Sequence, residues 1–236
     1  MSAGRLFLIP VTLGKSSTES VLPEEVIARA KRLSRFIAEN AKSARAFLKS
    51  LPADTPLQQI QICELNEHTS PEELSGLLSP LLSGEDIGLI SEAGCPAVAD
   101  PGTNLVALAH KTGISVIPMV GPSSILLALM ASGLSGQNFA FHGYLPAKTD
   151  LREKRIRELD KDSRLEKRTQ IFIETPYRSK QMLDSLIGSC SPSTKVCIAT
   201  DLTLDTEYIA TKTCGEWRKQ EFPAIDRRPT VFLLQA

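Results

Sequence analysis

Three loops of this 236-residue chain combine glycine, proline and hydroxyl side chains in a way that suits ligand binding. They cover residues 10–18 (PVTLGKSST), 91–102 (SEAGCPAVADPG) and 121–124 (GPSS), and each follows an apolar run. Glycine and proline set unusual backbone dihedrals and let a ligand approach the main chain closely. Exposed amides at a helix start add hydrogen-bond donors for an anion. Each loop is therefore either a tight strand-to-helix turn or one wall of a ligand site.

Other common sites are not indicated by the sequence. It contains neither the GxGxxG dinucleotide fingerprint nor the GxxxxGK[ST] phosphate loop. Five cysteines, at 63, 95, 190, 197 and 214, form no CxxC pair and lack the density of a disulfide scaffold, so we expect a reducing compartment and no metal site. The apolar run near the start is too short for a signal peptide or a membrane span. We therefore expect a cytoplasmic protein without a membrane partner.

The elements that must position these loops form an α/β pattern, because apolar runs of strand length alternate with helical periodicity. The expected strands are 5–11, 59–64, 86–91 and 115–120, followed by 139–144, 170–174, 195–201, 207–213 and 230–235. The expected helices are 71–82, with Ser70 as N-cap, then 103–111, 123–131, 151–165 and 179–187, and periodicity alone predicts one long helix from Pro23 to Leu48.

Two domains fit this pattern, residues 1–119 and 120–236. The first half alternates strand and helix throughout, which favours a mostly parallel sheet. In the second half, strands 195–201 and 207–213 follow one another directly, which favours a mixed sheet. Since open α/β sheets bind ligands beyond the carboxyl ends of their strands, the three loops all lie at the expected edge.

Charge is distributed unevenly, although the net charge is zero. Between Arg29 and Lys49 there are seven Lys or Arg residues against one acid, Glu39, whereas residues 51–110 hold nine acids and no Lys or Arg. Such asymmetry indicates either a strip that faces a polyanion or a solvated helix face.

The chain resembles the tetrapyrrole-methylase superfamily in five stretches that occur in the same order. They are SEAGCPAVADPG, VGPSS, FAFHGYLPAK, IFIETPYR and ATDLTLDTEYIATKT. Within the superfamily it is most similar to the branch that methylates a ribose 2′-hydroxyl of a cytidine in small-subunit ribosomal RNA. The resemblance implies the tetrapyrrole-methylase fold, a homodimer, and S-adenosylmethionine held in a cleft between the two domains. It also implies a short strand over 34–40, with a helix on either side, in place of one long helix.

The resemblance assigns cofactor contacts to particular positions. These are Pro10, Ala93, Gly94, Cys95, Val98, Ser123 and Ser124 in the first half and loop, and Glu174, Leu202, Pro229 and Thr230 in the second half. One segment departs from the ribosomal-RNA branch: Glu39-Asn40-Ala41-Lys42 stands where a Glu-Asp-Thr-Arg motif is common. Lys does not replace Arg at a bidentate site. The cofactor half of the site therefore matches the family better than the substrate half.

Methyl transfer from a sulfonium is an in-line displacement that needs alignment and exclusion of water, and no metal. Because a ribose hydroxyl is a poor nucleophile, a base would help, and the candidates are Glu39, Glu92 and Asp100. Each has a structural alternative: Glu39 as a helix cap, Glu92 as a solvated acid, and Asp100 as an acceptor for amides of its own loop.

Candidate substrate contacts are Lys42 and Arg45 in the basic strip, with Tyr177 for base stacking and Arg178 for a phosphate. The expected partner is ribosomal RNA or the small ribosomal subunit. Two other functions fit the same residues: carbon methylation of an acidic tetrapyrrole, and a non-catalytic cofactor-binding or ribosome-associated protein.

Overall fold

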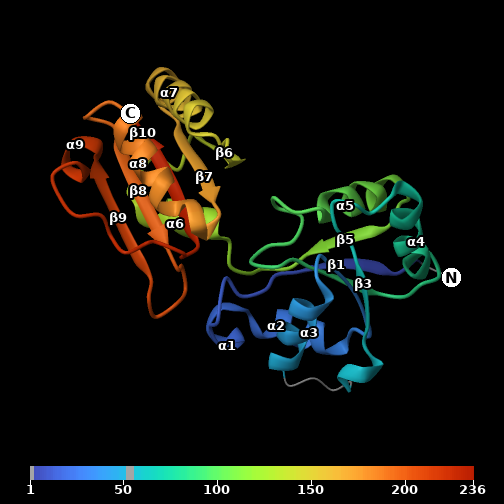
Figure 1. Cartoon of the computed structure of the whole chain (residues 1–236). Helices are drawn as coiled ribbons and strands as arrows, with labels where there is room; N and C mark the ends of the chain where they lie inside the picture. Colours follow the sequence, from blue (N-terminus) through green and yellow to red (C-terminus); the bar gives the residue numbers. More distant parts are fainter. Residues whose placement is uncertain (1–2, 52–55) are drawn as a thin grey trace. The chain divides into compact units, whose positions relative to one another are not determined.

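The computed structural model describes residues 3–51 and 56–236, and the chain divides into two compact units, one ending at Ser123 and the other beginning at Ser124 (Figure 1). Each unit contains one five-stranded sheet. The boundary predicted from the sequence lies slightly earlier in the same segment, between residues 119 and 120. Both sheets carry helices, so the expected α/β class is confirmed.

The first unit is built on a sheet with the strand order β3-β2-β4-β1-β5, in which every pairing is parallel. The strands are β1 (Arg5–Ile9), β2 (Arg35–Ala38), β3 (Gln61–Glu64), β4 (Ile87–Ile90) and β5 (Ser115–Pro118). The helices are α1 (Thr18–Val21), α2 (Glu24–Arg32), α3 (Ala41–Ser50), α4 (Pro71–Leu82) and α5 (Gly102–Lys111), with a 3-10 turn at Leu57–Gln59. The three inner strands β2, β4 and β1 are buried on both faces, which explains why they are apolar runs without alternation.

Strand β2 corrects the long helix that periodicity predicts over 23–48. The helix ends at Arg32, and α3 begins only at Ala41. Between them Phe36 packs among side chains of α2 and α3, whereas Ile37 packs on the opposite face with those of α4 and α5. Burial on two faces at once suits a central strand, so tertiary packing overrides the helical spacing. The short strand implied by the family resemblance is confirmed.

The second unit contains a mixed sheet with the order β6-β7-β10-β8-β9. Strands β6 and β7 are parallel, and the other neighbours are antiparallel. The strands are β6 (Phe139–Tyr144), β7 (Thr169–Glu174), β8 (Lys195–Thr200), β9 (Tyr208–Thr213) and β10 (Thr230–Gln235). The helices are α6 (Ser124–Ser132), α7 (Thr149–Glu166), α8 (Ser179–Ser189) and α9 (Cys214–Trp217), with a 3-10 turn at Pro176–Arg178. The expected mixed second sheet is confirmed.

The core of the second unit lies between its sheet and α7, α8 and α9. Phe172 and Phe232 stack with their ring centroids 6.0 Å apart and pack against Leu183 and Trp217. Helix α6 covers the other side of β8, β9 and β10. Across residues 3–51 and 56–236, no helix combines the length and apolar character needed to cross a membrane.

Candidate active site

The three loops selected from the sequence meet at the carboxyl edge of the first sheet, because β4, β1 and β5 are neighbours there. The amide of Val11 donates to the carbonyl of Gly94 at 2.9 Å, which joins the β1 loop to the β4 loop. The thiol of Cys95 lies 3.5 Å from the carbonyl oxygen of Pro122, which joins the β4 loop to the β5 loop. Burial raises the pKa of the Cys95 thiol, so this contact is made by a neutral group.

The loops approach so closely that two glycines are required. A Cβ on Gly121 would stand 2.3 Å from Cγ of Pro10, and one on Gly94 would stand 3.2 Å from the carbonyl oxygen of Pro122. Gly94 also adopts a φ of +71°, which side chains disfavour. The predicted cofactor residues Pro10, Ala93, Gly94 and Cys95 are therefore assembled in one place, where Pro10 and Gly94 are buried and Ala93 is exposed.

The β4 loop is held in shape by Asp100. Its Oδ1 accepts hydrogen bonds from the amides of Ala97 at 3.0 Å and Gly102 at 2.7 Å. Ala97 and Ala99 adopt positive φ angles of 63° and 58° without being glycine, a strain that other contacts must compensate. Between them the side chain of Val98 is half exposed. Asp100 thus has the structural role considered for it, as an acceptor for amides of its own loop. Its second oxygen has no such amide partner in the described chain.

The three candidate bases lie on this same edge. Burial raises the pKa of Glu39, and repulsion from Glu92, Asp100 and Glu67 raises it further. Burial also raises the pKa of Asp100, although its two amide hydrogen bonds oppose that shift. Among the described residues Glu39 makes no hydrogen bond, whereas Glu92 accepts one from the Ser43 hydroxyl. Of the three carboxylates, Glu39 is the one left unengaged for a ligand.

The segment that departs from the family motif forms the start of α3. Asn40 is its N-cap, and the Asn40 Oδ1 accepts from the amides of Lys42 at 2.9 Å and Ser43 at 3.3 Å. The amide of Ala41 is satisfied by Oε1 of Glu64 at 3.0 Å. Because Asp and Asn are both good N-cap residues, position 40 keeps its local role despite the change.

A second cluster of predicted residues lies within the second unit, where β7, β10 and β8 are neighbours. Thr230 pairs with Glu174 on one side and with Thr200 on the other. Glu174 is buried, and its Oε1 accepts from the Thr175 amide at 2.7 Å and from the Arg178 guanidinium at 2.7 and 3.0 Å. Its Oε2 is buried without any hydrogen-bond partner. Such an orphaned acceptor is costly unless a ligand donates to it.

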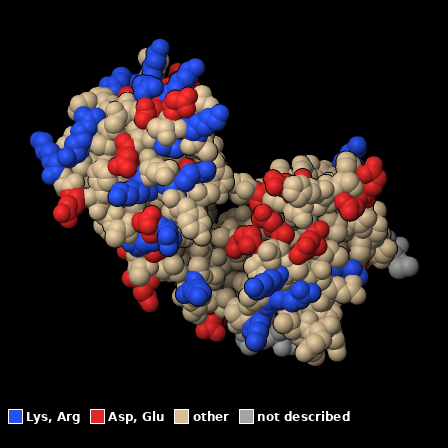
Figure 2. Space-filling view, viewed as in Figure 1, with Lys and Arg blue, Asp and Glu red and all other residues tan. Residues whose placement is uncertain are grey.

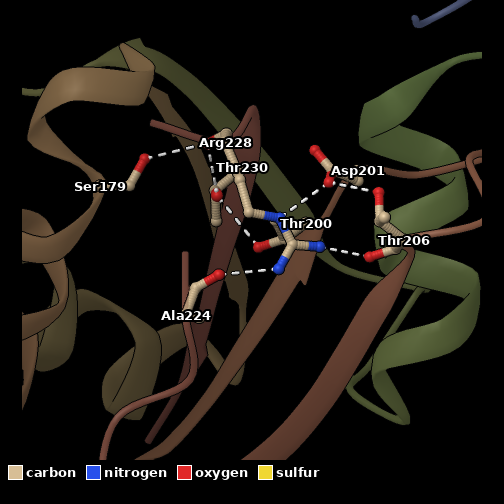
Figure 3. A network of polar contacts seen from close by, with 7 residues as sticks. All are labelled: Ser179, Thr200, Asp201, Thr206, Ala224, Arg228 and Thr230. Carbon is tan, nitrogen blue, oxygen red and sulfur yellow. Dashed lines mark hydrogen bonds and ion pairs between the residues drawn. The ribbon is translucent and has the colours of Figure 1, made fainter. Parts of the chain in front are cut away.

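A polar network holds this edge together (Figure 3). The Arg228 guanidinium contacts Asp201 Oδ2 at 2.7 Å and the carbonyls of Ala224 and Thr206, while Thr206 donates to the same Asp201 oxygen. Thr230 contacts the Thr200 hydroxyl at 3.0 Å. Leu202 follows Asp201 and is buried, and Pro229 accepts from the Asp201 amide at 3.0 Å. Asp201 and Arg228 were not predicted from the sequence. The available signal was Arg227-Arg228-Pro229, directly before the last strand.

The remaining predicted contacts are placed as follows. Tyr177 is highly exposed on the 3-10 turn, as a stacking residue would be. Arg178 is committed to Glu174, so it positions that carboxylate and has less capacity for a phosphate. Ser123 and Ser124 lie where the first unit ends and α6 begins.

The chemical groups in these two clusters suit the binding of S-adenosylmethionine. Main-chain groups around residues 94 and 121, where the three loops pack closely, can bind an adenosyl or amino-acid portion. The orphaned Glu174 Oε2 needs a donor such as a ribose hydroxyl or an ammonium. Within the described residues no group of three His, Cys, Asp or Glu side chains could hold a metal ion.

Comparison with known sequences agrees with the family resemblance found in the sequence. A family model described as Tetrapyrrole (Corrin/Porphyrin) Methylases matches residues 6–217. The ribosomal RNA small subunit methyltransferase I of Vibrio cholerae is 37% identical over 145 residues, which are 61% of this chain and 49% of that protein. Its counterpart from Pseudomonas aeruginosa is 32% identical over 213 residues, 89% of this chain and 70% of that protein. The match therefore spans about half the length of the first relative and most of the second.

Solved structures share the fold. The methyltransferase CobJ superposes with a TM-score of 0.64 at 18% identity, covering 99% of this chain and 94% of that one. A uroporphyrin-III C-methyltransferase from Thermus thermophilus, complexed with S-adenosylhomocysteine, superposes with a TM-score of 0.59 at 15% identity, covering 98% and 97%.

Proposed function

Because the chain belongs to the tetrapyrrole methylase family, we propose that it methylates a ribose 2′-hydroxyl of small-subunit ribosomal RNA. Membership makes it a methyltransferase with S-adenosylmethionine as methyl donor. Two relatives at 37% and 32% identity carry small-subunit ribosomal RNA in their names, which supports RNA as the acceptor. The loops at the carboxyl edge of β4, β1 and β5, joined through Val11, Gly94 and Pro122, are the observation that carries the proposal.

We assign the cofactor to two sets of residues, one in each unit. In the first, Pro10 and the loop from Ala93 to Val98 supply backbone contacts. In the second, the assigned contacts are Glu174 Oε2, Leu202 and the Pro229-Thr230 pair. Ser123 and Ser124, where the first unit ends and α6 begins, are assigned as contacts too. Arg178 and Asp201 are positioning residues, since one orients Glu174 and the other orients the β8 end through Arg228.

The reaction requires a proton acceptor and an aligned nucleophile. When bound, S-adenosylmethionine supplies an electrophilic methyl group on its sulfonium sulfur. We assign Glu39 as the base, because it is unengaged and its raised pKa makes it a better proton acceptor than an ordinary carboxylate. The carboxylate takes the hydroxyl proton as the oxygen–carbon bond forms, and the carbon–sulfur bond breaks with its electron pair left on sulfur. We assign supporting roles to Glu92 and Asp100: Glu92 accepts a hydrogen bond from the Ser43 hydroxyl, and Asp100 accepts from an amide of the β4 loop.

The test combines transfer and mapping. The protein is incubated with methyl-labelled S-adenosylmethionine and small ribosomal subunits from cells lacking its gene. We expect label in RNA at one ribose, recovered as a dinucleotide that resists alkali because the 2′-oxygen can no longer attack its phosphate. Label on a base would overturn the ribose assignment, and label found only in added tetrapyrroles would overturn the RNA assignment.

We further propose that the enzyme acts as a cytoplasmic homodimer. The ribosomal substrate supports the location, and the resemblance to homodimeric methylases supports the oligomeric state. Large apolar side chains are exposed on α6 and on the edge strand β6, including Met130, Phe139 and Tyr144. Exposed apolar groups on an edge strand or on a helix are features that a second copy can cover.

A further inference from the structure

The basic strip between Arg29 and Lys49 includes two cations that contact other side chains of the first unit. Arg29 stacks over the Phe7 ring at 4.5 Å, and Arg35 forms an ion pair with Glu85 at 3.1 Å. These side chains serve the packing of the first unit. The cations of α3 behave differently.

Helix α3 carries Lys42, Arg45 and Lys49, and all three are exposed. Their spacing of three and four residues aligns them along one side of the helix. None forms an ion pair with a described residue, and α3 contains no acid. Lysines and arginines gather over α2 and α3 in Figure 2. We call Lys42, Arg45 and Lys49 the α3 stripe.

Helix α7, in contrast, has equal numbers of basic and acidic residues. It holds six basic and six acidic residues. Three of its four arginines pair with acids of the same helix: Arg155 with Glu158 at 3.1 Å, Arg157 with Glu153 at 3.7 Å and Arg164 with Asp160 at 3.3 Å. A solvated helix face that binds no partner would be expected to mix acids with cations, as α7 does. The α3 stripe contains cations alone.

The position of Lys42 in the first turn of α3 also has an electrostatic cost. Helices α2 and α4 place acids in their first turns, which suits the positive end of the helix dipole, whereas α3 has Lys42 there and no acid. A cation at this end is unfavourable in isolation and favourable when an anion binds between the helix start and the lysine. The Glu64 carboxylate accepts from the Ala41 amide and offsets part of the positive charge at this end, and the exposed ammonium of Lys42 is left for a further anion.

Helix α3 is attached to the candidate active site. It starts at Asn40, directly after the proposed base Glu39, and the Ser43 hydroxyl donates to Glu92 in the β4 loop. Lys42 therefore lies closest to the reacting groups, and Arg45 and Lys49 lead away from them along the helix. An extended anion placed on the stripe would have one end at the site of transfer.

We propose that the α3 stripe binds successive phosphates of the RNA strand whose ribose is methylated. The inference rests on the proposed RNA methyltransferase function and adds the surface that sets the register between the strand and Glu39. Backbone phosphates fit better than a compact tetrapyrrole because the cations follow a line and lack ion-pair partners. Such contacts position a nucleic acid without reading its sequence.

The test compares two triple variants with matched charge loss. One is Lys42→Gln with Arg45→Gln and Lys49→Gln; the control, Lys154→Gln with Arg157→Gln and Lys161→Gln, removes the same residue types at the same spacing from α7. The probe for binding is an in vitro transcript of small-subunit ribosomal RNA, titrated between 50 and 500 mM salt. Methyl transfer to small subunits and S-adenosylmethionine affinity are measured in parallel.

We expect the α3 variant to lower the slope of log K against log salt by about 2, since each lost phosphate contact removes roughly 0.7 for a single strand. The corresponding loss of affinity is on the order of 100-fold at 0.1 M salt. The α7 variant should match the wild type, and both variants should keep the wild-type affinity for S-adenosylmethionine.

The outcomes separate this inference from the proposed function. If the wild type methylates ribosomal RNA and the α3 variant keeps the same salt slope and rate as the α7 variant, the stripe is not the RNA surface and the function stands. If the wild type transfers no methyl group to ribosomal RNA under any condition tested, the proposed function falls and the inference falls with it.

Discussion

Individual carboxylates at the edge of the first sheet have different roles, and substitutions of Asp100 can distinguish a structural role from a catalytic one. Asp100→Ala removes the acceptor for two amides in a loop that holds Ala97 and Ala99 at positive φ. Leaving such groups unsatisfied costs about 1–3 kcal/mol of unfolding free energy, and we expect S-adenosylmethionine affinity to fall as the loop loosens.

Asp100→Asn is the matched variant, because its amide oxygen can still accept both hydrogen bonds while its basicity is gone. We expect it to keep most of the cofactor affinity and turnover, measured by calorimetry and by transfer of labelled methyl groups. Loss of turnover in Asp100→Asn with cofactor affinity intact would instead make Asp100 the proton acceptor.

For Glu39 the raised pKa gives a prediction with a sign. An acid whose pKa is raised in the folded state stabilises the fold less once ionised, so stability is lost as pH rises from its ordinary pKa through the raised one. Glu39→Gln should therefore have a higher melting temperature than the wild type at neutral pH, with the difference shrinking at acidic pH.

The same substitution should lower methyl transfer, by roughly 10²–10⁴-fold if Glu39 is the general base. Glu92→Gln gives a check on the cause, because removing the repulsion from Glu92 should lower the pKa of Glu39 and move both the stability window and the pH–rate profile to lower pH. An unchanged pH–rate profile in Glu92→Gln would contradict this coupling.

At the scale of elements, the site depends on how closely the β1 and β5 loops pack. Gly121→Ala would bring a methyl group to 2.3 Å from Cγ of Pro10, so the two loops must separate. Overpacking of this kind costs about 1–3 kcal/mol, and we expect weaker S-adenosylmethionine binding as well.

The control for Gly121→Ala is Gly76→Ala in α4, where a Cβ meets nothing within 4 Å. There we expect a gain of about 0.5–1 kcal/mol, because alanine is the better helix former. Denaturant unfolding and calorimetric titration measure both effects. Equal cofactor affinity in Gly121→Ala and wild type would separate the loop packing from the binding site.

Local signals in the sequence were sufficient for most elements. Ser70 with Glu73 predicted the start of α4, and the structure has the full capping box. The same local reasoning was wrong over 23–48, since the helical spacing continues through Phe36 and Ile37, and only their burial on opposite faces reveals β2. The loops after β1, β4 and β5 were predicted from their glycine and proline residues. The Asp201–Arg228 contact was not, because it joins residues 27 positions apart with no shared motif.

At the scale of the whole molecule, the proposed homodimer makes a prediction about the surface of the second unit. Met130 on α6 is 80% exposed, and Phe139 on the edge strand β6 is 41% exposed. A charge at a buried interface costs far more than the same charge in water. Met130→Lys should therefore weaken the dimer at least 10-fold, seen by sedimentation equilibrium as a shift toward monomer at micromolar concentration.

Leu165→Lys is the matched control, since Leu165 is 70% exposed at the end of α7, a helix on the face of the second sheet opposite to α6. It changes charge and apolar area in the same direction, so it should leave the dimer intact if the interface uses α6. A monomeric wild type at every concentration would exclude the dimer, and equal weakening by both variants would exclude this face. Methyl transfer by Met130→Lys, measured below and above its dissociation constant, then tells whether each active site works without its partner copy.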